Sequence, residues 1–342
     1  MKITINALDT LTFGVGKPSV WGEDTFGAGM FPPFPSVVRG AARTAWLCEN
    51  GSVEMADTDE DPTKKYAITE YALLLDGEPH FPVPADCLID GNGKLVQCKL
   101  KENDGLSNLA DPCQLYAETD GKISKISKIS SAEGRYVSKS ELQRYLDGGT
   151  LSCCVPLSDY ITDESKIGIF KERGRGTVKE GMLYRLPLTR PATAQKNASL
   201  AANIEGMDEI PGLTRFGGEN KVANFTGYGG GISPCGNIGE DGSFKLYIAT
   251  PAIFKGGFKP PVPDCAELLA AAVCGYDSVG GFDMKNRRPK PMRRAVRAGS
   301  VFYYELTQNT PANREAILGL HGSSIGDFSR EDGFGICYVG KI

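Results

Sequence analysis

Histidine is scarce in this sequence, which has only His80 and His321 among its 342 residues. Zinc sites and nucleophilic catalytic sites commonly use histidine, so few of either kind can be assembled here. The ten cysteines form no CxxC pair, and no stretch has the spacing of a Walker A motif. We therefore expect no metal site and no cofactor. We expect the cysteines to be reduced, small core residues of a cytoplasmic protein.

The two histidines lie in different sequence surroundings. His80 stands in a run bounded by prolines, and we interpret it as a packed side chain. His321 is a candidate general base for metal-independent RNA cleavage, which would require a partner residue. The adjacent carboxylates Glu23-Asp24 and Asp163-Glu164 lack the spacing of metal ligands, so we interpret both pairs as loop or surface residues.

Long apolar runs are missing as well. No signal peptide is visible at Met1-Lys-Ile-Thr-Ile5, which alternates like a strand, and we expect no association with a membrane. The formal net charge is −4, so the chain as a whole does not attract nucleic acid and any such binding has to be local. Glycine is frequent, with 42 residues, which indicates many turns or close backbone approaches.

One stretch concentrates positive charge in this acidic chain. Residues 283–297 contain one acid, Asp283, and the seven basic residues Lys285, Arg287, Arg288, Lys290, Arg293, Arg294 and Arg297. Prolines at 289 and 291 predict an extended or looped segment, which leads into a strand at residues 300–306. A basic segment beside an aromatic strand suits a polyphosphate backbone, and a solvated surface loop is the alternative.

Two further segments combine glycine with basic residues. Lys255 and Lys259 flank Gly256 and Gly257, and a second run holds two glycines with Lys171, Arg173, Arg175 and Lys179. Glycine lets a phosphate approach main-chain N–H groups closely. We therefore predict that all three basic segments contact nucleic acid, with ordinary turn glycines as the alternative.

The first helix is expected over residues 37–49, with Ser36 as its N-cap. Arg39, Arg43 and Trp46 would share one face of it. Cations near a helix N-terminus oppose the helix dipole, so either anion binding or plain solvation would explain the two arginines. The acidic residues 50–64 that follow are expected to form a loose, mobile excursion.

Capping patterns predict two further helices. Ser138-Lys-Ser-Glu141 opens one that ends at Gly148, and Asp264-Cys-Ala-Glu267 opens one that ends at Gly275. A short helix is expected near residues 313–319. Few helices and many short strands predict two α+β domains with antiparallel sheets and a boundary near residue 150.

Several motifs occur in an order that resembles a known family. The most specific pair is Thr250-Pro-Ala-Ile-Phe-Lys-Gly-Gly-Phe-Lys-Pro260 followed by Arg288-Pro-Lys-Pro-Met-Arg-Arg-Ala295. The others are Leu8-Asp-Thr-Leu11, Gly22-Glu-Asp24, Phe31-Pro-Pro-Phe-Pro-Ser36, Lys166-Ile-Gly-Ile169, Glu180-Gly-Met-Leu-Tyr184, Phe216-Gly-Gly-Glu219, Gly280-Gly-Phe282, Ala298-Gly-Ser300 and Gly333-Phe-Gly335. Together they resemble the third subunit of the Cmr effector complex of type III-B CRISPR systems, in the RAMP superfamily.

This resemblance implies an α+β fold of two ferredoxin-like (RRM-type) domains, residues 1–150 and 151–342, the second of which carries the basic stretch. It implies a non-catalytic, RNA-binding subunit of an antiviral ribonucleoprotein. Such a subunit holds the 5′ handle of the guide RNA and bridges the large polymerase-like subunit to the first backbone RAMP subunit. Target RNA then lies near the handle and is contacted indirectly.

The resemblance also implies RNA contacts at particular positions. Carried over residue by residue, they are Arg39, Arg43, Lys255, Lys259, Arg288, Lys290, Arg293 and Arg294, with Phe282 placed to stack on a base. From the same segments we add Gly256, Gly257, Arg287 and Arg297. We infer a separate RNA clamp at Lys171, Arg173, Arg175 and Lys179.

Two alternatives belong to other functional classes. The first is a stand-alone RAMP-type endoribonuclease that cuts guide RNA precursors without metal and depends on His321. The second is a protein-only scaffold, in which the basic stretch meets an acidic partner. The scarcity of histidine favours the RNA-binding subunit over the nuclease.

Overall fold

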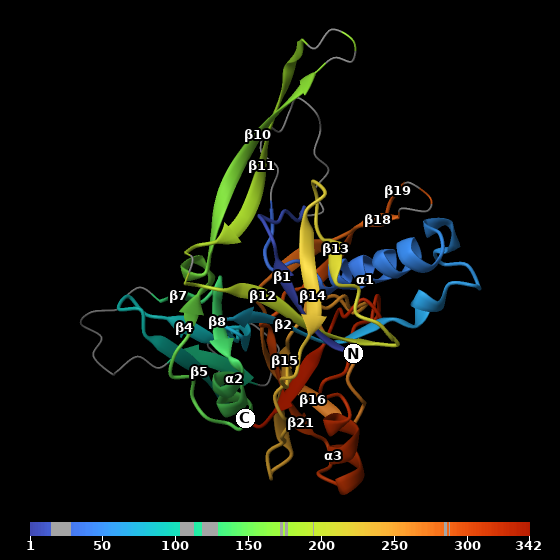
Figure 1. The fold of residues 1–342 in the computed structure, drawn as a ribbon. Coiled ribbons are helices and arrows are strands. Elements are labelled where there is room, and N and C mark those ends of the chain that lie inside the picture. Colours follow the sequence, from blue (N-terminus) through green and yellow to red (C-terminus); the bar gives the residue numbers. More distant parts are fainter. Residues whose placement is uncertain are drawn as a thin grey trace.

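The computed structural model describes residues 1–14, 29–102, 113–117 and 129–342, apart from positions 172, 173, 175, 176, 194, 284, 285 and 287. Of residues 170 and 178–184 only the backbone is described. Antiparallel sheets dominate the fold, and a few short helices pack beside them (Figure 1). The expected α+β class with antiparallel sheets is therefore confirmed. Among the described helices, none is both long and apolar enough to cross a membrane.

The first sheet has eight strands, all paired antiparallel. From one edge to the other they are β13 (Leu213–Arg215), β14 (Val222–Gly227), β1 (Lys2–Ala7), β12 (Ala198–Glu205), β2 (Ala67–Leu75), β3 (Glu78–Pro82), β8 (Arg135–Ser138) and β9 (Val155–Pro156). In β1 the alternation read from the sequence holds, because Ile3 and Ile5 are buried. Strands β1 and β2 lie on either side of β12 and are joined through a helix, so they form a split β-α-β unit.

The helix of this unit is α1 (Pro35–Asn50), which buries Val38, Ala42 and Leu47. It starts two residues earlier than expected, and its N-cap residue is Phe34, which makes no side-chain cap. The prediction of Ser36 as the cap is therefore wrong. Pro35 takes the first helical position, where its missing N–H has no partner to lose and its fixed φ suits the helix.

The acidic segment after α1 is ordered, contrary to expectation. It contains two short 3₁₀ helices, η1 (Val53–Met55) and η2 (Pro62–Lys65). The buried Asp61 accepts hydrogen bonds from the main chain and side chain of Thr63 and from Arg43. Burial alone would raise the pKa of Asp61, but these hydrogen bonds lower it to about 2. The carboxylate thus ties the segment to α1.

The second sheet has four strands in the order β16 (Ala266–Ala272), β21 (Val301–Leu306), β15 (Ser243–Ile248) and β22 (Cys337–Gly340). Strand β21 confirms the aromatic strand expected after the basic stretch. Strands β21 and β22 flank β15 and are connected through α3 (Pro311–Leu318), which gives a second split β-α-β unit. The short helix expected near residues 313–319 is confirmed by α3.

The helix expected over residues 264–275 is wrong, because most of that segment forms β16. The run Ala266-Glu-Leu-Leu-Ala-Ala-Ala272 favours a helix by local propensity. As an edge strand it instead pairs with β21 through a bulge between Leu268 and Ala270. Leu269 and Ala270 become buried. Pairing and burial supplied by the rest of the sheet outweigh a local preference of a few tenths of a kcal/mol per residue.

The helix expected after Ser138 is confirmed as α2 (Lys139–Leu146). Ser138 Oγ accepts the main-chain N–H of Glu141 at 3.3 Å, which is half of a capping box. The Glu141 carboxylate does not turn back to the cap. It accepts the main-chain N–H of Ser152 at 2.7 Å and the hydroxyl of the same residue at 2.9 Å. Glu141 therefore fixes the chain that leaves the helix.

Two hairpin-like ribbons and one small sheet extend from this body. The long ribbon β10 (Ile161–Lys171) and β11 (Val178–Pro191) projects well beyond the rest of the molecule (Figure 1). The shorter one pairs β17 (Tyr276–Val279) with β20 (Arg293–Val296), and then β18 (Phe282–Asp283) with β19 (Arg288–Pro289). The small sheet has the order β6 (Cys113–Ala117), β5 (Leu95–Glu102), β4 (Cys87–Ile89) and β7 (Ser130–Ser131). A third 3₁₀ turn, η3 (Leu157–Asp159), precedes β10.

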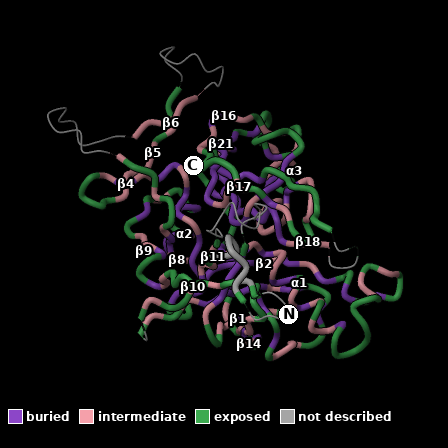
Figure 2. Tube along the Cα trace, turned by 90° about the horizontal axis from the view of Figure 1, so that it is seen from above, coloured by how far each residue is buried: buried purple, intermediate pink, exposed green. Residues whose placement is uncertain are grey.

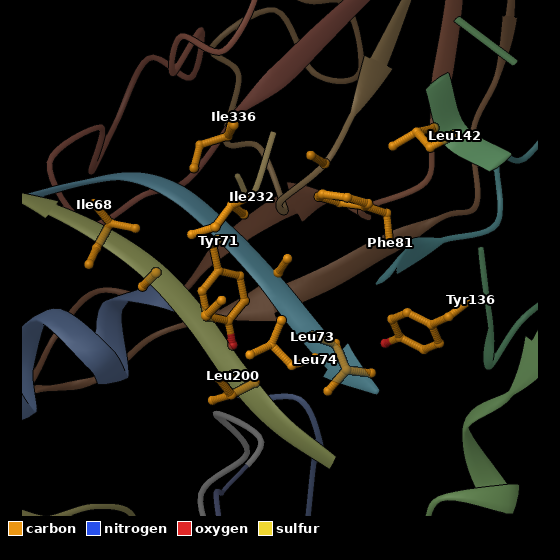
Figure 3. Packing of buried hydrophobic residues seen from close by; sticks show 14 of the residues in the cluster. Ile68, Tyr71, Leu73, Leu74, Phe81, Tyr136, Leu142, Leu200, Ile232 and Ile336 are labelled. Carbon is orange, nitrogen blue, oxygen red and sulfur yellow. The ribbon is translucent and has the colours of Figure 1, made fainter. Parts of the chain in front are cut away.

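The core joins the two sheets. Buried residues gather in the middle of the molecule, with exposed loops around them (Figure 2). Ile232 and Ile336 lie near Tyr71 of the first sheet in one cluster (Figure 3). Polar contacts cross the same region. The buried Asp86 accepts hydrogen bonds from the hydroxyl groups of Tyr145 and Tyr303, with oxygen–oxygen distances of 2.8 and 2.5 Å. The first sheet, α2 and the second sheet therefore pack as one body.

The order of the strands locates the change from one sheet to the other. Strands from both sides of residue 150 share the first sheet, which ends with β14 at Gly227. The second sheet begins with β15 at Ser243. The sheets therefore change between residues 227 and 243, whereas the boundary read from the sequence lies near residue 150.

Candidate nucleic-acid interface

The described parts of the basic stretch are largely extended, as one of the two expected alternatives has it, and they pair as an antiparallel ribbon. Pro289 lies at the end of β19, where a missing N–H does not interrupt the short ladder. Arg294 pairs with Ser278 and Arg293 pairs with Val279 across β17 and β20. The backbone pairing gives Arg288, Arg293 and Arg294 a defined face of the ribbon.

A second basic motif is fastened to this ribbon. Ala252 and Val296 exchange two main-chain hydrogen bonds, of 2.9 and 2.7 Å. Beneath them a small apolar cluster of Ile253, Val279, Ala295 and Phe334 is buried. The segment 250–260 and the ribbon were expected to act together, and the structure brings them side by side.

Lys255 and Arg293 meet at one aromatic ring, that of Phe328. The Arg293 guanidinium carbon lies 3.8 Å from the ring centroid, and Lys255 Nζ lies 5.7 Å from it. Both basic residues are exposed, as are Gly256, Gly257 and Lys259 on the same turn. Phe328 was not expected from the sequence, because a lone phenylalanine 35 residues after Arg293 carries no local signal of such a contact.

The outer part of the ribbon is exposed and rich in aromatic and basic groups. The Arg294 guanidinium carbon lies 4.7 Å from the ring centroid of Tyr276, another residue missed from the sequence. Phe282, the expected stacking residue, is 53% exposed. Arg288 and Lys290 are exposed as well, while Arg287 lies outside the described residues. Hydrogen bonds from Asn286 lower the pKa of Asp283, the one acid of the stretch, so it is charged near neutral pH.

Arg297 differs from the other basic residues of the stretch. Its guanidinium donates to Asp277 at 2.9 Å and to Glu133 at 2.7 Å. Burial raises the pKa of Asp277, although Arg297 opposes that shift. The expectation of an RNA contact at Arg297 is therefore not supported, since two carboxylates already neutralise its charge.

Arg39 and Arg43 are likewise committed to partners within the chain. Arg39 is 9% exposed and donates to Asp332 at 2.9 Å and to the carbonyl of Tyr66 at 2.6 Å. Arg43 donates to Asp57 at 2.8 Å and to Asp61 at 2.7 Å. The prediction that these arginines bind RNA is not supported by their environment, because acids distant in the sequence fold back onto α1.

Of the expected clamp residues, Lys171 is the last residue of β10. Lys171 is exposed there. Arg173 and Arg175 fall outside the described residues, as does the side chain of Lys179. Ile167 and Ile169, two residues apart on one face of β10, are 59% and 44% exposed. The ribbon therefore carries apolar as well as basic side chains away from the body.

Neither histidine is placed as a general base. His321 Nε2 donates to the carbonyl of Pro234 at 3.0 Å, and its Nδ1 accepts the N–H of Val339 at 3.1 Å. Burial lowers the pKa of His321, so the ring is neutral near pH 7. His80 is buried, as expected, and its Nδ1 donates to the carbonyl of Glu78 at 2.9 Å. Both nitrogens of His321 are thus occupied by the backbone.

Other catalytic and metal-binding patterns find little support in the described part of the chain. Gly322-Ser-Ser-Ile-Gly326 has the G-x-S-x-G spacing of a hydrolase nucleophile motif. Ser324 Oγ donates to the carbonyl of Phe334, and no helix follows the serine as a nucleophile elbow requires. Within the described ranges no three His, Cys, Asp or Glu side chains gather as metal ligands. Glu164 of the second acidic pair forms an ion pair with Arg190 at 2.8 Å, while Glu23-Asp24 lies outside those ranges.

A cavity of about 850 Å³ opens between the base of the β10–β11 ribbon and the base of the basic ribbon. Its walls are largely apolar and include the proline-rich segment 31–35. Its charged lining residues are Asp163, Glu133, Asp277, Arg135 and Arg297. Acids outnumber basic groups here, so the cavity disfavours phosphate, unlike the surface around Lys255 and Arg293.

Solved structures with a similar fold are known. The fold is similar to a chain of the type III-B Cmr-beta complex in two cryo-EM structures, one bound to cognate target RNA and AMPPnP and one to cognate target RNA. The TM-score is 0.52 in both cases, the identities are 16% and 17%, and the match covers 89% of this chain and 86% of the other. At such identities the likeness concerns the fold. No curated protein matches the sequence. The sequence itself matches the family described as CRISPR-associated protein (Cas_Cmr3) over residues 3–342. This chain therefore belongs to the Cmr3 family of CRISPR-associated proteins.

Proposed function

We propose that this chain is a non-catalytic, RNA-binding subunit of a type III-B CRISPR effector complex in the cytoplasm. It holds the 5′ handle of the guide RNA and bridges the large polymerase-like subunit to the first backbone RAMP subunit. One observation carries the proposal: in a chain of net charge −4, exposed basic residues of two distant motifs lie together on the surface around Lys255 and Arg293.

Three features support binding to single-stranded RNA. The exposed cations of this surface lie beside exposed or half-buried aromatic rings, which single-stranded nucleic-acid sites combine with charge. Gly256 and Gly257 are exposed in their turn, so no side chain there keeps a phosphate away from the main chain. The backbone contacts of His321 argue against the general base that a metal-independent nuclease would need.

We further infer that the two split β-α-β units are reduced ferredoxin-like domains. Such a domain places its four strands in the order 4-1-3-2 with a helix in each of two crossovers. In the first unit β14, β1, β12 and β2 follow this order with α1 in one crossover. In the second unit β22, β15, β21 and β16 follow it with α3 in the other. Each unit thus retains one helix, and the domains as inferred run to about residue 227 and from about residue 243.

The test is a pull-down of the tagged full chain from its native host, with the 5′ ends of the bound RNA sequenced. Short RNAs that share one constant 5′ end, together with co-purifying effector subunits, are the expected result. Partners without RNA would overturn handle binding and favour the protein-only scaffold. Trimmed precursor fragments without partners would favour the endoribonuclease, and that outcome would require activity without His321 as its base.

A further inference from the structure

Three segments far apart in the sequence meet where Lys255, Arg293 and Phe328 come together. Lys255 follows Phe254 in the glycine turn, Arg293 opens β20, and Phe328 lies between α3 and β22. Within the described ranges neither Lys255 Nζ nor the Arg293 guanidinium has a carboxylate within ion-pair distance. Arg39, Arg43 and Arg297 all have such partners. Lys255 and Arg293 are therefore basic groups that remain available to a ligand.

The ring of Phe328 is held in place from below and from the side. It packs against the buried cluster of Ile253, Val279, Ala295 and Phe334. The neighbouring Asp327 donates its N–H to the carbonyl of Ile253 at 2.8 Å and accepts the N–H of Lys255 on Oδ2 at 2.7 Å. These bonds fix the glycine turn to the ring. One carboxylate oxygen of Asp327 is used in this way, and two cations against one acid leave the site positive.

The geometry at Arg293 leaves room for a flat ligand. A guanidinium carbon 3.8 Å from a ring centroid lies against the face of that ring. Arg293 is exposed, so the opposite face of the guanidinium is turned to solvent. Guanidinium planes stack on unpaired bases in RNA complexes, and the Lys255 ammonium, 5.7 Å from the same ring centroid, suits the adjacent phosphate. A paired duplex would not offer the base face that this arrangement accommodates.

We propose that Phe328, Arg293 and Lys255 form a binding site for one unpaired nucleotide of single-stranded RNA. The base stacks on the outer face of the Arg293 guanidinium, Lys255 contacts the adjacent phosphate, and Phe328 is the positioning residue that orients both. This assignment rests on the proposed function and adds to it a residue outside the basic motifs. It also gives the glycine turn a role, since the turn brings Lys255 to the ring.

The test compares Phe328→Tyr with Phe328→Leu in the full chain. The probe is a fluorescein-labelled, mixed-sequence single-stranded RNA of about ten nucleotides, within the usual site sizes of such proteins. Tyrosine keeps an aromatic face for Arg293, whereas leucine keeps apolar packing and loses that face. We expect Phe328→Tyr to bind as tightly as wild type and Phe328→Leu to bind about two to five times more weakly, the range of a surface cation–π contact.

Thermal unfolding of both variants controls for packing, and Arg293→Gln covers the case in which the leucine variant does not fold. Arg293→Gln is expected to weaken binding to a similar degree and to leave the salt slope nearly unchanged, because Lys255 keeps the phosphate contact. Equal losses of RNA affinity in the tyrosine and leucine variants would overturn the site. They would show that binding does not depend on an aromatic face at position 328. Wild-type affinity in the Arg293→Gln variant would overturn it too. Absence of salt-dependent RNA binding by the wild-type chain would instead overturn the proposed function.

Discussion

Arg293 and Arg294 are neighbours in the sequence, yet their guanidinium groups lie against different aromatic rings. Arg293 contacts Phe328 at 3.8 Å and Arg294 contacts Tyr276 at 4.7 Å. Successive side chains of a strand point to opposite faces, so β20 directs one arginine to each side of the ribbon. The basic ribbon therefore has two separate cation–aromatic surfaces, and a nucleotide stacked on one arginine does not reach the other.

A double-mutant cycle on RNA affinity tests this separation. Truncating Arg293 and Phe328 to alanine, singly and together, is expected to give a coupling energy of about 0.5–1 kcal/mol, because the two side chains are in contact. Arg294 and Phe328 share no contact, so their cycle is the matched control and should be additive within about 0.3–0.5 kcal/mol. Equal coupling in both cycles would contradict the two-surface arrangement.

Arg39 is expected to matter for stability and not for RNA. Arg39→Met leaves Asp332 without its ion-pair partner and the carbonyl of Tyr66 without its donor. Breaking a buried pair in this way should reduce the free energy of unfolding by about 3 kcal/mol. Denaturant unfolding measures this loss, and the slope of log affinity against log salt for single-stranded RNA should stay unchanged.

Lys255→Gln is the matched opposite of that variant. The Lys255 side chain is exposed and has no ion pair among the described residues. The free energy of unfolding should therefore change by no more than about 0.5 kcal/mol. The salt slope should fall by about 0.7, which corresponds to one lost phosphate contact on a single strand. If Arg39→Met lowered the salt slope in a fully folded protein, the assignment of Arg39 to the interior would be wrong.

The sequence was informative where a local pattern matched a local structure. The alternation in β1, the cap at Ser138 and the short helix α3 all follow from neighbouring residues, and all are confirmed. The two basic motifs were expected to act together, and the bonds between Ala252 and Val296 join them. Family resemblance placed these motifs, and the family match confirms that assignment.

The sequence misled where distant residues decide the outcome. The run that forms β16 favours a helix by local propensity, but it forms a strand because it pairs with β21. The sequence indicates that Arg39 is an exposed cation, but in the fold it forms an ion pair with Asp332, near the end of the sequence. No sequence feature distinguishes Phe328 from the other aromatic residues, but in the fold it contacts Arg293. In each case the deciding partner lies at least 29 residues away, beyond any pattern of spacing within one element.

Gly333, in the closing motif of the chain, should tolerate no side chain. Its φ is +83°, and an added Cβ would lie 2.8 Å from Cβ of Ile68 and 3.0 Å from Cβ of Pro35. Gly333→Ala is expected to reduce the free energy of unfolding by about 3 kcal/mol, the combined cost of a left-handed backbone and of overpacking. Gly77 has a similar φ of +86° with no atom near its added Cβ, so Gly77→Ala isolates the backbone cost of about 1 kcal/mol. Equal losses in urea unfolding of the two variants would show that crowding at Gly333 is unimportant.

Lys245 is expected to make stability depend on pH above neutrality. Its side chain is buried, and Nζ lies 3.5 Å from the ring centroid of Tyr145. Burial lowers the pKa of Lys245 to about 8, although Asp86 and Cys87 favour its charged form. The unfolded chain holds this proton up to a pKa of about 10.4, so between about pH 8 and pH 10 it binds more protons than the folded chain. Stability contributed by this group therefore rises with pH across that window, and the full cost of burying the charge remains below pH 8.

Lys245→Met removes this titration and keeps the volume of the side chain. Thiols and phenols in the same region also titrate above pH 8, so the measured quantity is the difference between wild type and variant in free energy of unfolding. The free energy of unfolding of wild type should rise relative to that of the variant by about 2 kcal/mol between pH 7 and pH 9.5, for a pKa shift of this size. Urea unfolding at half-unit pH steps measures the difference. Parallel pH profiles would show that water reaches the amine and leaves its pKa near the unfolded value, and an opposite slope would require a pKa raised by Asp86.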